Sequence, residues 1–199
     1  MHQQTITCLN GIFMPAHEAS LPIADRGFRF GDGVFETIRL EGGVPYQWKT
    51  HLSRLEAGLG ALRITPPAVD WQAMAKQMIE KNHVSDGYLR ISISRGVGSR
   101  GYMPDADIQA NWAVEYLPPT PAPNAPCKLW LSAITRPAPS ALPVHHKLAH
   151  GIGSTLALLE VRDHGCDEAL MLSADGHISE ASSGNIFWVM GEQLFTPAL

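Results

Sequence analysis

A proline-rich segment divides this chain and limits how it can fold. Residues 117–126 (LPPTPAPNAP) hold five prolines in ten positions. Proline has no backbone N–H and a fixed φ, so such a run neither pairs inside a sheet nor continues a helix, and it favours an extended spacer. The sequence therefore predicts an N-terminal domain over residues 1–117, a linker over residues 118–126 and the start of a second domain over residues 127–199.

The first part of the chain alternates between strand and helix patterns. Residues 5–14 form two β-rich runs around Asn10-Gly11, a strong hairpin signal. Periodicity predicts the other elements: strands at 34–40, 44–48, 87–94 and 111–117, a helix from Thr50 and a helix at 71–81 with Asp70 as its N-cap.

The second part also mixes strands and helix. The same patterns predict a strand at 128–134, a helix at about 152–164 ended by Gly165, and strands at 168–173 and 185–190 with a turn at Asp175-Gly176 between them. Strands interspersed with helices in both parts predict a two-domain fold of the α/β or α+β class.

Composition excludes several classes of protein. The net charge of −4 favours neither nucleic acid nor an anionic membrane surface as a partner. No apolar run is long enough to span a bilayer, and residues 1–6 show no signal peptide. The three cysteines, Cys8, Cys127 and Cys166, form neither a disulfide framework nor a metal knuckle. We expect a cytoplasmic enzyme with reduced thiols.

Three histidines raise the question of a metal site. His146 and His150 are four residues apart, which would place both on one face of a helix, and His145 is adjacent. No H-E-x-x-H motif and no acidic third ligand accompany them, so we expect no bound metal.

Two segments carry residues with paired chemistry. Lys147 lies in residues 143–150 (PVHHKLAH), and Glu180 follows 33 positions later in residues 178–187 (ISEASSGNIF). A lysine amine forms an imine with a cofactor aldehyde, and a carboxylate keeps a neighbouring ring nitrogen protonated. Alone, either residue would be read as solvent-exposed. Together the segments resemble the fold-type IV pyridoxal-phosphate enzymes, which include branched-chain and D-amino-acid aminotransferases and 4-amino-4-deoxychorismate lyase.

This resemblance implies roles for five residues. Lys147 carries pyridoxal 5'-phosphate as a Schiff base and serves as the catalytic base. Glu180 faces the pyridine nitrogen. Arg54, in the H-L-S-R-L run, matches the arginine that binds the cofactor phosphate, and a guanidinium fork suits phosphate oxygens. Ser182 and Ser183 line the phosphate turn.

Residues 94–102 (SRGVGSRGY) form a further signature. No G-K-[ST] follows it, so its spacing fits no nucleotide-binding loop. In the family this loop reaches the active site of the partner subunit, which implies that Arg100 and Tyr102 bind a substrate carboxylate. Phe35 should point at the active site, although a core aromatic is an equal reading. The form R-G-x-G-x-R-G-Y looks most like the lyases, and phenylalanine rather than tyrosine at Phe35 disfavours a D-amino-acid aminotransferase.

The resemblance implies a homodimeric enzyme with a small N-terminal α/β domain and a larger barrel-like domain. The most favoured activity is 4-amino-4-deoxychorismate lyase, which makes 4-aminobenzoate and pyruvate for folate synthesis. A class IV aminotransferase of branched-chain or D-amino-acid type is the first alternative. The family pattern continues past residue 199 into a segment that completes the phosphate site. We therefore expect the chain to be incomplete at its C-terminus, and a truncated, cofactor-free relative is the second alternative.

Overall fold

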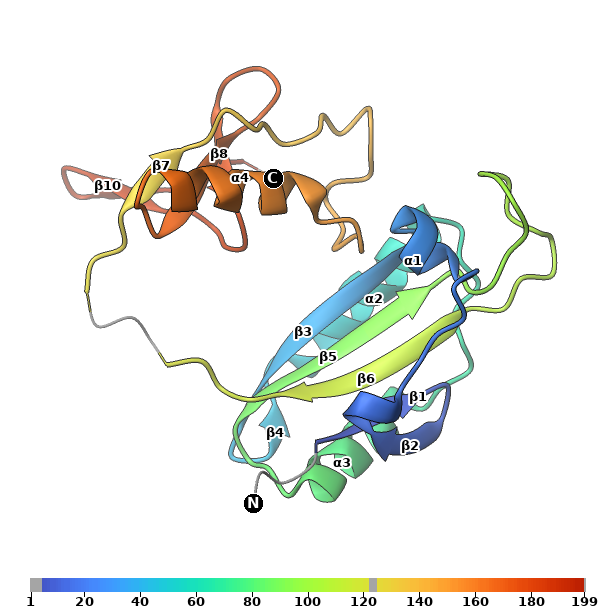
Figure 1. Cartoon of the computed structure of the whole chain (residues 1–199). Helices are drawn as coiled ribbons and strands as arrows, with labels where there is room; N and C mark the ends of the chain where they lie inside the picture. Colours follow the sequence, from blue (N-terminus) through green and yellow to red (C-terminus); the bar gives the residue numbers. More distant parts are fainter. Residues whose placement is uncertain (1–4, 122–124, 199) are drawn as a thin grey trace. The chain divides into compact units, whose positions relative to one another are not determined.

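The computed structural model describes residues 5–121 and 125–198 (Figure 1). Residues 122–124 of the predicted linker lie outside this description. Contacts group the chain into two units. The first holds residues up to Thr120 together with His146–His150, and the second holds Pro121–His145 and the chain from Gly151 onward. Among the described residues, no helix has both the length and the apolar character needed to cross a membrane.

The first unit is built on a six-stranded sheet in the order β2-β1-β6-β5-β3-β4. Its strands are β1 (Ile6–Leu9), β2 (Ile12–Pro15), β3 (Gly33–Glu41), β4 (Val44–Pro45), β5 (Gly87–Ser94) and β6 (Asn111–Leu117). All neighbouring pairs are antiparallel. The longest ladder joins β3 to β5, from Gly33 opposite Ser94 to Leu40 opposite Gly87.

Two helices, α2 (Trp48–Ala61) and α3 (Trp71–Asn82), cover one face of this sheet (Figure 1). Alternate residues of the central strands are buried in the core with Leu55, Leu59 and Met78 of the helices. Each fully buried aliphatic side chain contributes about 1.5–3 kcal/mol. The intervening residues of β3 and β5 point to the opposite face and are half-buried or exposed, which leaves them available for ligand contacts.

Most of the elements predicted for this unit are confirmed. The hairpin turns at Asn10-Gly11, and Asp70 caps α3 by accepting a hydrogen bond from Ala73 N at 3.0 Å. The start of α2 was predicted wrongly, because the helix begins at Trp48 rather than Thr50. Gln47 adopts a left-handed conformation with φ 48°, which turns the chain into the helix early and shortens the predicted strand to β4.

A short helix that was not predicted, α1 (Arg26–Phe30), precedes β3. Asp25 is its N-cap and accepts hydrogen bonds from Gly27 N and Phe28 N. The Asp25 side chain is buried and also accepts from Ser94 Oγ at 2.7 Å. This network joins the start of the helix to the end of β5.

Residues 146–150 return to the first unit and run beside β3. Phe35 N donates a hydrogen bond to Lys147 O at 3.0 Å, and Ala149 N donates to Gly33 O at 2.8 Å. Backbone hydrogen bonds therefore fix the position of Lys147 independently of its side chain.

The second unit contains a three-stranded sheet in the order β7-β8-β9 and a hairpin. Its elements are β7 (Leu129–Leu131), α4 (Ile152–Asp163), β8 (Glu168–Leu172), β9 (Ile178–Ala181), β10 (Trp188–Met190) and β11 (Gln193–Phe195). Strands β7 and β8 are parallel, and α4 connects to β8 and packs Ala157 and Val161 against its Ala169 and Met171.

Three predictions for this unit need correction. The strand predicted at 128–134 is the shorter β7, which covers only Leu129–Leu131. The turn at Asp175-Gly176 leads into β9, a strand that was not predicted and that pairs antiparallel with β8. Glu180 therefore lies on a strand rather than in a turn. The predicted strand at 185–190 begins only at Trp188, because Ser182 to Phe187 form the connection after β9.

Candidate functional site

Lys147, Phe35 and Arg90 form a cluster on the first unit. Lys147 Nζ lies 5.1 Å from the centroid of the Phe35 ring, and Arg90 Cζ lies 4.0 Å from the same centroid. An aromatic ring attracts cations to its face, by about 0.5–2 kcal/mol for each contact. The ring of Phe35 therefore helps to hold both side chains in place.

Arg90 was not among the residues predicted for the site. Strand alternation offered a signal for it, because Arg90 and Ser92 occupy the same face of β5. The β3–β5 register places Ser92 opposite Phe35 and Arg90 opposite Thr37. That register depends on a pairing of segments more than 50 residues apart, which the sequence alone did not supply.

A cavity of about 240 Å³ opens beside Phe35 and Arg90. Much of its wall is apolar, with Phe28 and Trp112 among the aromatic contributors and Ala149 from the lysine segment. The polar lining residues are Asp25, Arg90, Ser92, Ser94 and Asn111. The cavity can hold a small ring with an anionic group directed at Arg90.

Arg54 is bound by a buried carboxylate. Glu36 on β3 is 1% exposed. Arg54 Nε lies 2.5 Å from Glu36 Oε1, and Nη2 lies 2.7 Å from Oε2. His51 Nδ1 lies 2.8 Å from the same Oε2. Among the described residues Arg54 Nη1 makes no hydrogen bond, so this nitrogen can bind an anion.

The pKa values of the pair follow from these contacts. Burial raises the pKa of Glu36, but hydrogen bonds from Arg54 and His51, together with their charges, outweigh burial and hold it below its ordinary value. The hydrogen bond to Glu36 raises the pKa of Arg54, against the effect of burial. Both groups therefore stay charged, and the guanidinium is oriented.

We predict that Glu36 makes stability depend on acid pH. The pKa of Glu36 in the folded protein lies below the ordinary value of 4.5. Its contribution to the free energy of unfolding is therefore complete above about pH 4.5 and is lost as the pH falls below that value. Glu36→Gln should lower the free energy of unfolding at pH 7 by about 1–3 kcal/mol. Below pH 4.5 it should also make this free energy depend less steeply on pH. Urea titrations from pH 3 to 7 measure both effects.

Glu41→Gln is the matched control for this prediction, because Glu41 lies at the end of the same strand but is 65% exposed. It should leave the slope unchanged. An identical acid slope in Glu36→Gln and the native protein would contradict the assignment.

Arg100 and Tyr102 lie on the loop between β5 and β6. Arg100 is exposed, and 84% of the Tyr102 surface is accessible. The Tyr102 ring centroid lies 5.3 Å from that of Phe30 on α1. The loop therefore presents both side chains outward, where another molecule can contact them.

Glu180 in the second unit forms an ion pair with Arg136. Arg136 was not predicted, and it is held in turn by a backbone bond from its N–H to Leu172 O at 2.8 Å. The ion pair orients the Glu180 carboxylate on β9.

The turn after β9 contains a buried hydroxyl without a partner. Ser182 Oγ is buried and makes no hydrogen bond to any described residue. The carboxylate of Glu168 fixes the turn, accepting from Ser182 N at 3.2 Å and from Ser183 Oγ at 3.4 Å. An unsatisfied buried hydroxyl costs about 1–3 kcal/mol, so this geometry suits a bound anion or water. Glu168 was not predicted either, because its role depends on the β8–β9 pairing.

Comparisons with known proteins agree with this chemistry. The family model described as amino-transferase class IV matches residues 33–199. The aminodeoxychorismate lyase of Vibrio harveyi is 30% identical over 92% of this chain and 68% of its own length. A putative branched-chain-amino-acid aminotransferase of Methanocaldococcus jannaschii is 30% identical over 95% of this chain and 67% of its own length.

The fold is also that of solved enzymes. The structure of the Escherichia coli branched-chain amino acid aminotransferase superposes with a TM-score of 0.89 at 25% identity, covering 98% of this chain and 68% of that one. This likeness confirms the expected fold-type IV architecture. The chain spans about two thirds of the length of these relatives. It belongs to the class IV aminotransferase family, a family of enzymes that depend on pyridoxal phosphate.

Proposed function

We propose that the protein is a lyase that converts aminodeoxychorismate into 4-aminobenzoate and pyruvate. The observation that carries this proposal is the Phe35 cluster, where Lys147 and Arg90 approach one aromatic ring beside an aromatic-lined cavity. A cyclic substrate with an amine and carboxylates matches these groups. The R-G-x-G-x-R-G-Y loop and the similarity to the Vibrio harveyi lyase support the same choice.

The residues present fit pyridoxal phosphate. We propose that Arg54 Nη1 is a donor for the cofactor phosphate, and that Ser182 and Ser183 are phosphate donors on the second unit. The unpartnered hydroxyl of Ser182 supports this assignment. Glu180, oriented by its ion pair with Arg136, would face the ring nitrogen and favour its protonated form. When bound, the cofactor supplies an electrophilic carbon and a ring that accepts an electron pair.

Lys147 has two tasks in this mechanism. Its amine would hold the cofactor, and once released Nζ would take the proton from the amine-bearing ring carbon of the substrate. The electron pair of that C–H bond would expel enolpyruvate as the C–O bond breaks and the ring becomes aromatic, and the enolpyruvate would take up a proton to give pyruvate. Phe35 and the backbone bonds of Lys147 hold the segment in place during this transfer.

Two arginines suit the two carboxylates of aminodeoxychorismate. Arg90 faces the cavity and is a candidate for one carboxylate. Arg100 is exposed on its loop, and we propose that it binds the other with Tyr102 in the site of a partner subunit. A homodimer is therefore part of this proposal, and sedimentation of the purified protein tests it.

The activity test separates the lyase from an aminotransferase. The protein is supplied with aminodeoxychorismate alone, and separately with branched-chain amino acids and 2-oxoglutarate. Pyruvate release without an amino acceptor is the expected result. Glutamate formation without pyruvate release would instead favour the aminotransferase, which the similarity to branched-chain enzymes supports as the second candidate.

A further inference from the structure

A buried arginine on α1 holds the backbone that follows Arg100. Arg26 is 4% exposed, and its Nε donates to Asp32 Oδ2 at 2.8 Å. Its Nη1 donates to Gly101 O at 3.0 Å, and its Nη2 donates to Tyr102 O at 2.8 Å. All three nitrogens are therefore used, two of them on consecutive carbonyls directly after Arg100.

A second arginine fixes the start of the same loop. Arg95 Nε lies 2.7 Å from Asp32 Oδ2, and Nη2 lies 2.9 Å from Oδ1. Arg95 also donates to the carbonyls of Leu62 and Arg63. Burial raises the pKa of Asp32, but hydrogen bonds and charges from the two arginines lower it below the ordinary value. One ionised carboxylate thus joins two guanidinium groups that support different parts of the loop.

The glycines of the R-G-x-G run allow this close approach. A Cβ atom on Gly98 would lie 2.9 Å from Arg26 Cδ. Gly96 has φ +104°, and a Cβ there would lie 1.8 Å from Gln109 O. A side chain at Gly98 would therefore collide with Arg26, and one at Gly96 would collide with the backbone at Gln109.

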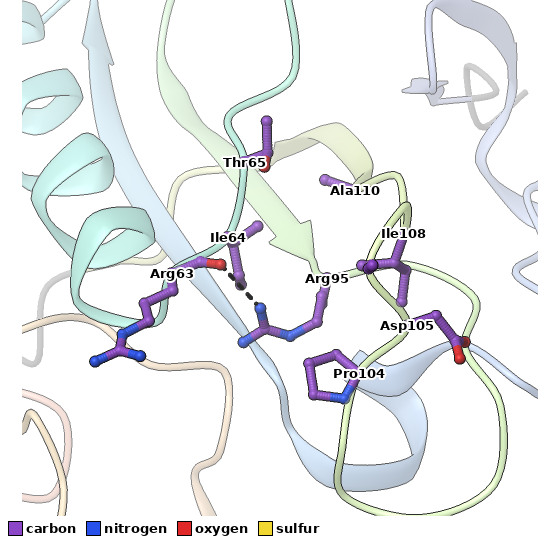
Figure 2. A pocket seen from close by; sticks show the side chains of 9 residues that line it. Arg63, Ile64, Thr65, Arg95, Pro104, Asp105, Ile108 and Ala110 are labelled. Atoms are coloured by element: carbon purple, nitrogen blue, oxygen red, sulfur yellow. Dashed lines mark hydrogen bonds between the residues drawn. The ribbon is translucent and has the colours of Figure 1, made fainter.

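Packing holds the far side of the loop less tightly. Figure 2 shows a cavity between the loop residues 104–110, Arg95 and the segment 63–65, with a volume of about 240 Å³. The Arg63 side chain points away from the other lining residues, and each nitrogen of Arg95 already has an acceptor. The side-chain contacts of Arg26 and Arg95 therefore restrain the loop together with the bonds from Ser99 to Asp105 and from Gly98 N to Ala24 O.

We propose that Arg26, with Asp32, is a positioning residue that fixes the loop so that Arg100 and Tyr102 receive the substrate carboxylate. This inference rests on the proposed role of Arg100. A loop that is ordered before binding loses less conformational freedom when the carboxylate arrives. The contact with Phe30, the last residue of α1, holds the tyrosine ring against the same short helix.

Trypsin cleavage after Arg100 tests the loop directly in the native protein. Arg100 is exposed, so only a fixed backbone protects the bond to Gly101. We expect cleavage there to be at least about tenfold slower than in a synthetic peptide of residues 95–110, because trypsin can cut an ordered loop only while that loop is locally open. Cleavage as fast as in the peptide would overturn the proposal without any variant.

Arg26→Lys keeps the charge but lacks the fork that reaches two carbonyls. It should speed cleavage after Arg100 and raise KM for the carboxylated substrate about 10- to 100-fold, with kcat and the absorbance band of bound cofactor little changed. Arg29→Lys, an exposed arginine on the same helix, is the control and should match the native protein.

The outcomes separate this inference from the proposed function. A folded Arg26→Lys variant with native cleavage and native KM would refute the positioning role. If instead Arg100→Ala leaves KM unchanged, the carboxylate role of Arg100 is wrong, whereas cleavage of Arg26→Lys still reports on the loop. If Arg26→Lys does not fold, the comparison of native protein with peptide decides.

Discussion

Lys147→Ala is expected to remove nearly all turnover while the protein stays folded. Loss of a positioned base alone costs about 10²- to 10⁴-fold, and loss of the covalent link to the cofactor adds to this. The fold should persist because the segment is held by Lys147 O and its neighbours through backbone bonds that alanine keeps. Pyruvate release and the absorbance band of the lysine-linked cofactor are the two measurements.

Borohydride reduction and peptide mass mapping identify the lysine in the native protein. The cofactor should be found on Lys147, and Lys49→Ala, an exposed lysine on α2, should leave both measurements unchanged. Reduced cofactor on Lys49, Lys76, Lys81 or Lys128 would contradict the assignment.

Glu180→Gln is expected to lower kcat about 10²- to 10³-fold, equivalent to about 2.7–4 kcal/mol, the usual cost of removing one electrostatic partner of the reacting group. Glutamine keeps the shape on β9 but removes the charge that would hold the ring nitrogen protonated. Steady-state kinetics and cofactor titration measure turnover and binding separately.

Glu192→Gln changes an exposed carboxylate in the turn between β10 and β11 and is the matched control. It should retain native turnover. Native kcat in Glu180→Gln with cofactor fully bound would show that Glu180 serves only the structure, through its pair with Arg136.

Local signals predicted most of the first unit. The Asn10-Gly11 turn, the alternation of β3 and the Asp70 cap each act within a few residues, so short windows of sequence reveal them. Strand β9 escaped prediction because it is four residues long and partly polar, and its stability comes from pairing with β8. The early helix start at Gln47 was not predicted, because a left-handed residue other than glycine has no reliable sequence signal.

The residues of the candidate site also divide into those that the sequence identifies and those that only the fold identifies. Lys147 and Glu180 stand out because family motifs surround them. Glu36 and Arg26 carry no local signal, and alternation indicates only the strand face of Arg90, since each matters through partners brought together by the fold. A buried charged residue can be recognised only when its oppositely charged partner is known, and that partner is identified only once the fold has brought the two residues together.

The return of residues 146–150 to the first unit affects how this protein can be made and divided. Synthesis of the N-terminal 120 residues leaves the backbone groups of Gly33 and Phe35 without the segment that later pairs with them. The first unit is completed only after residue 150 has left the ribosome. A cut at the proline-rich segment would yield a fragment that lacks this segment and, with it, Lys147.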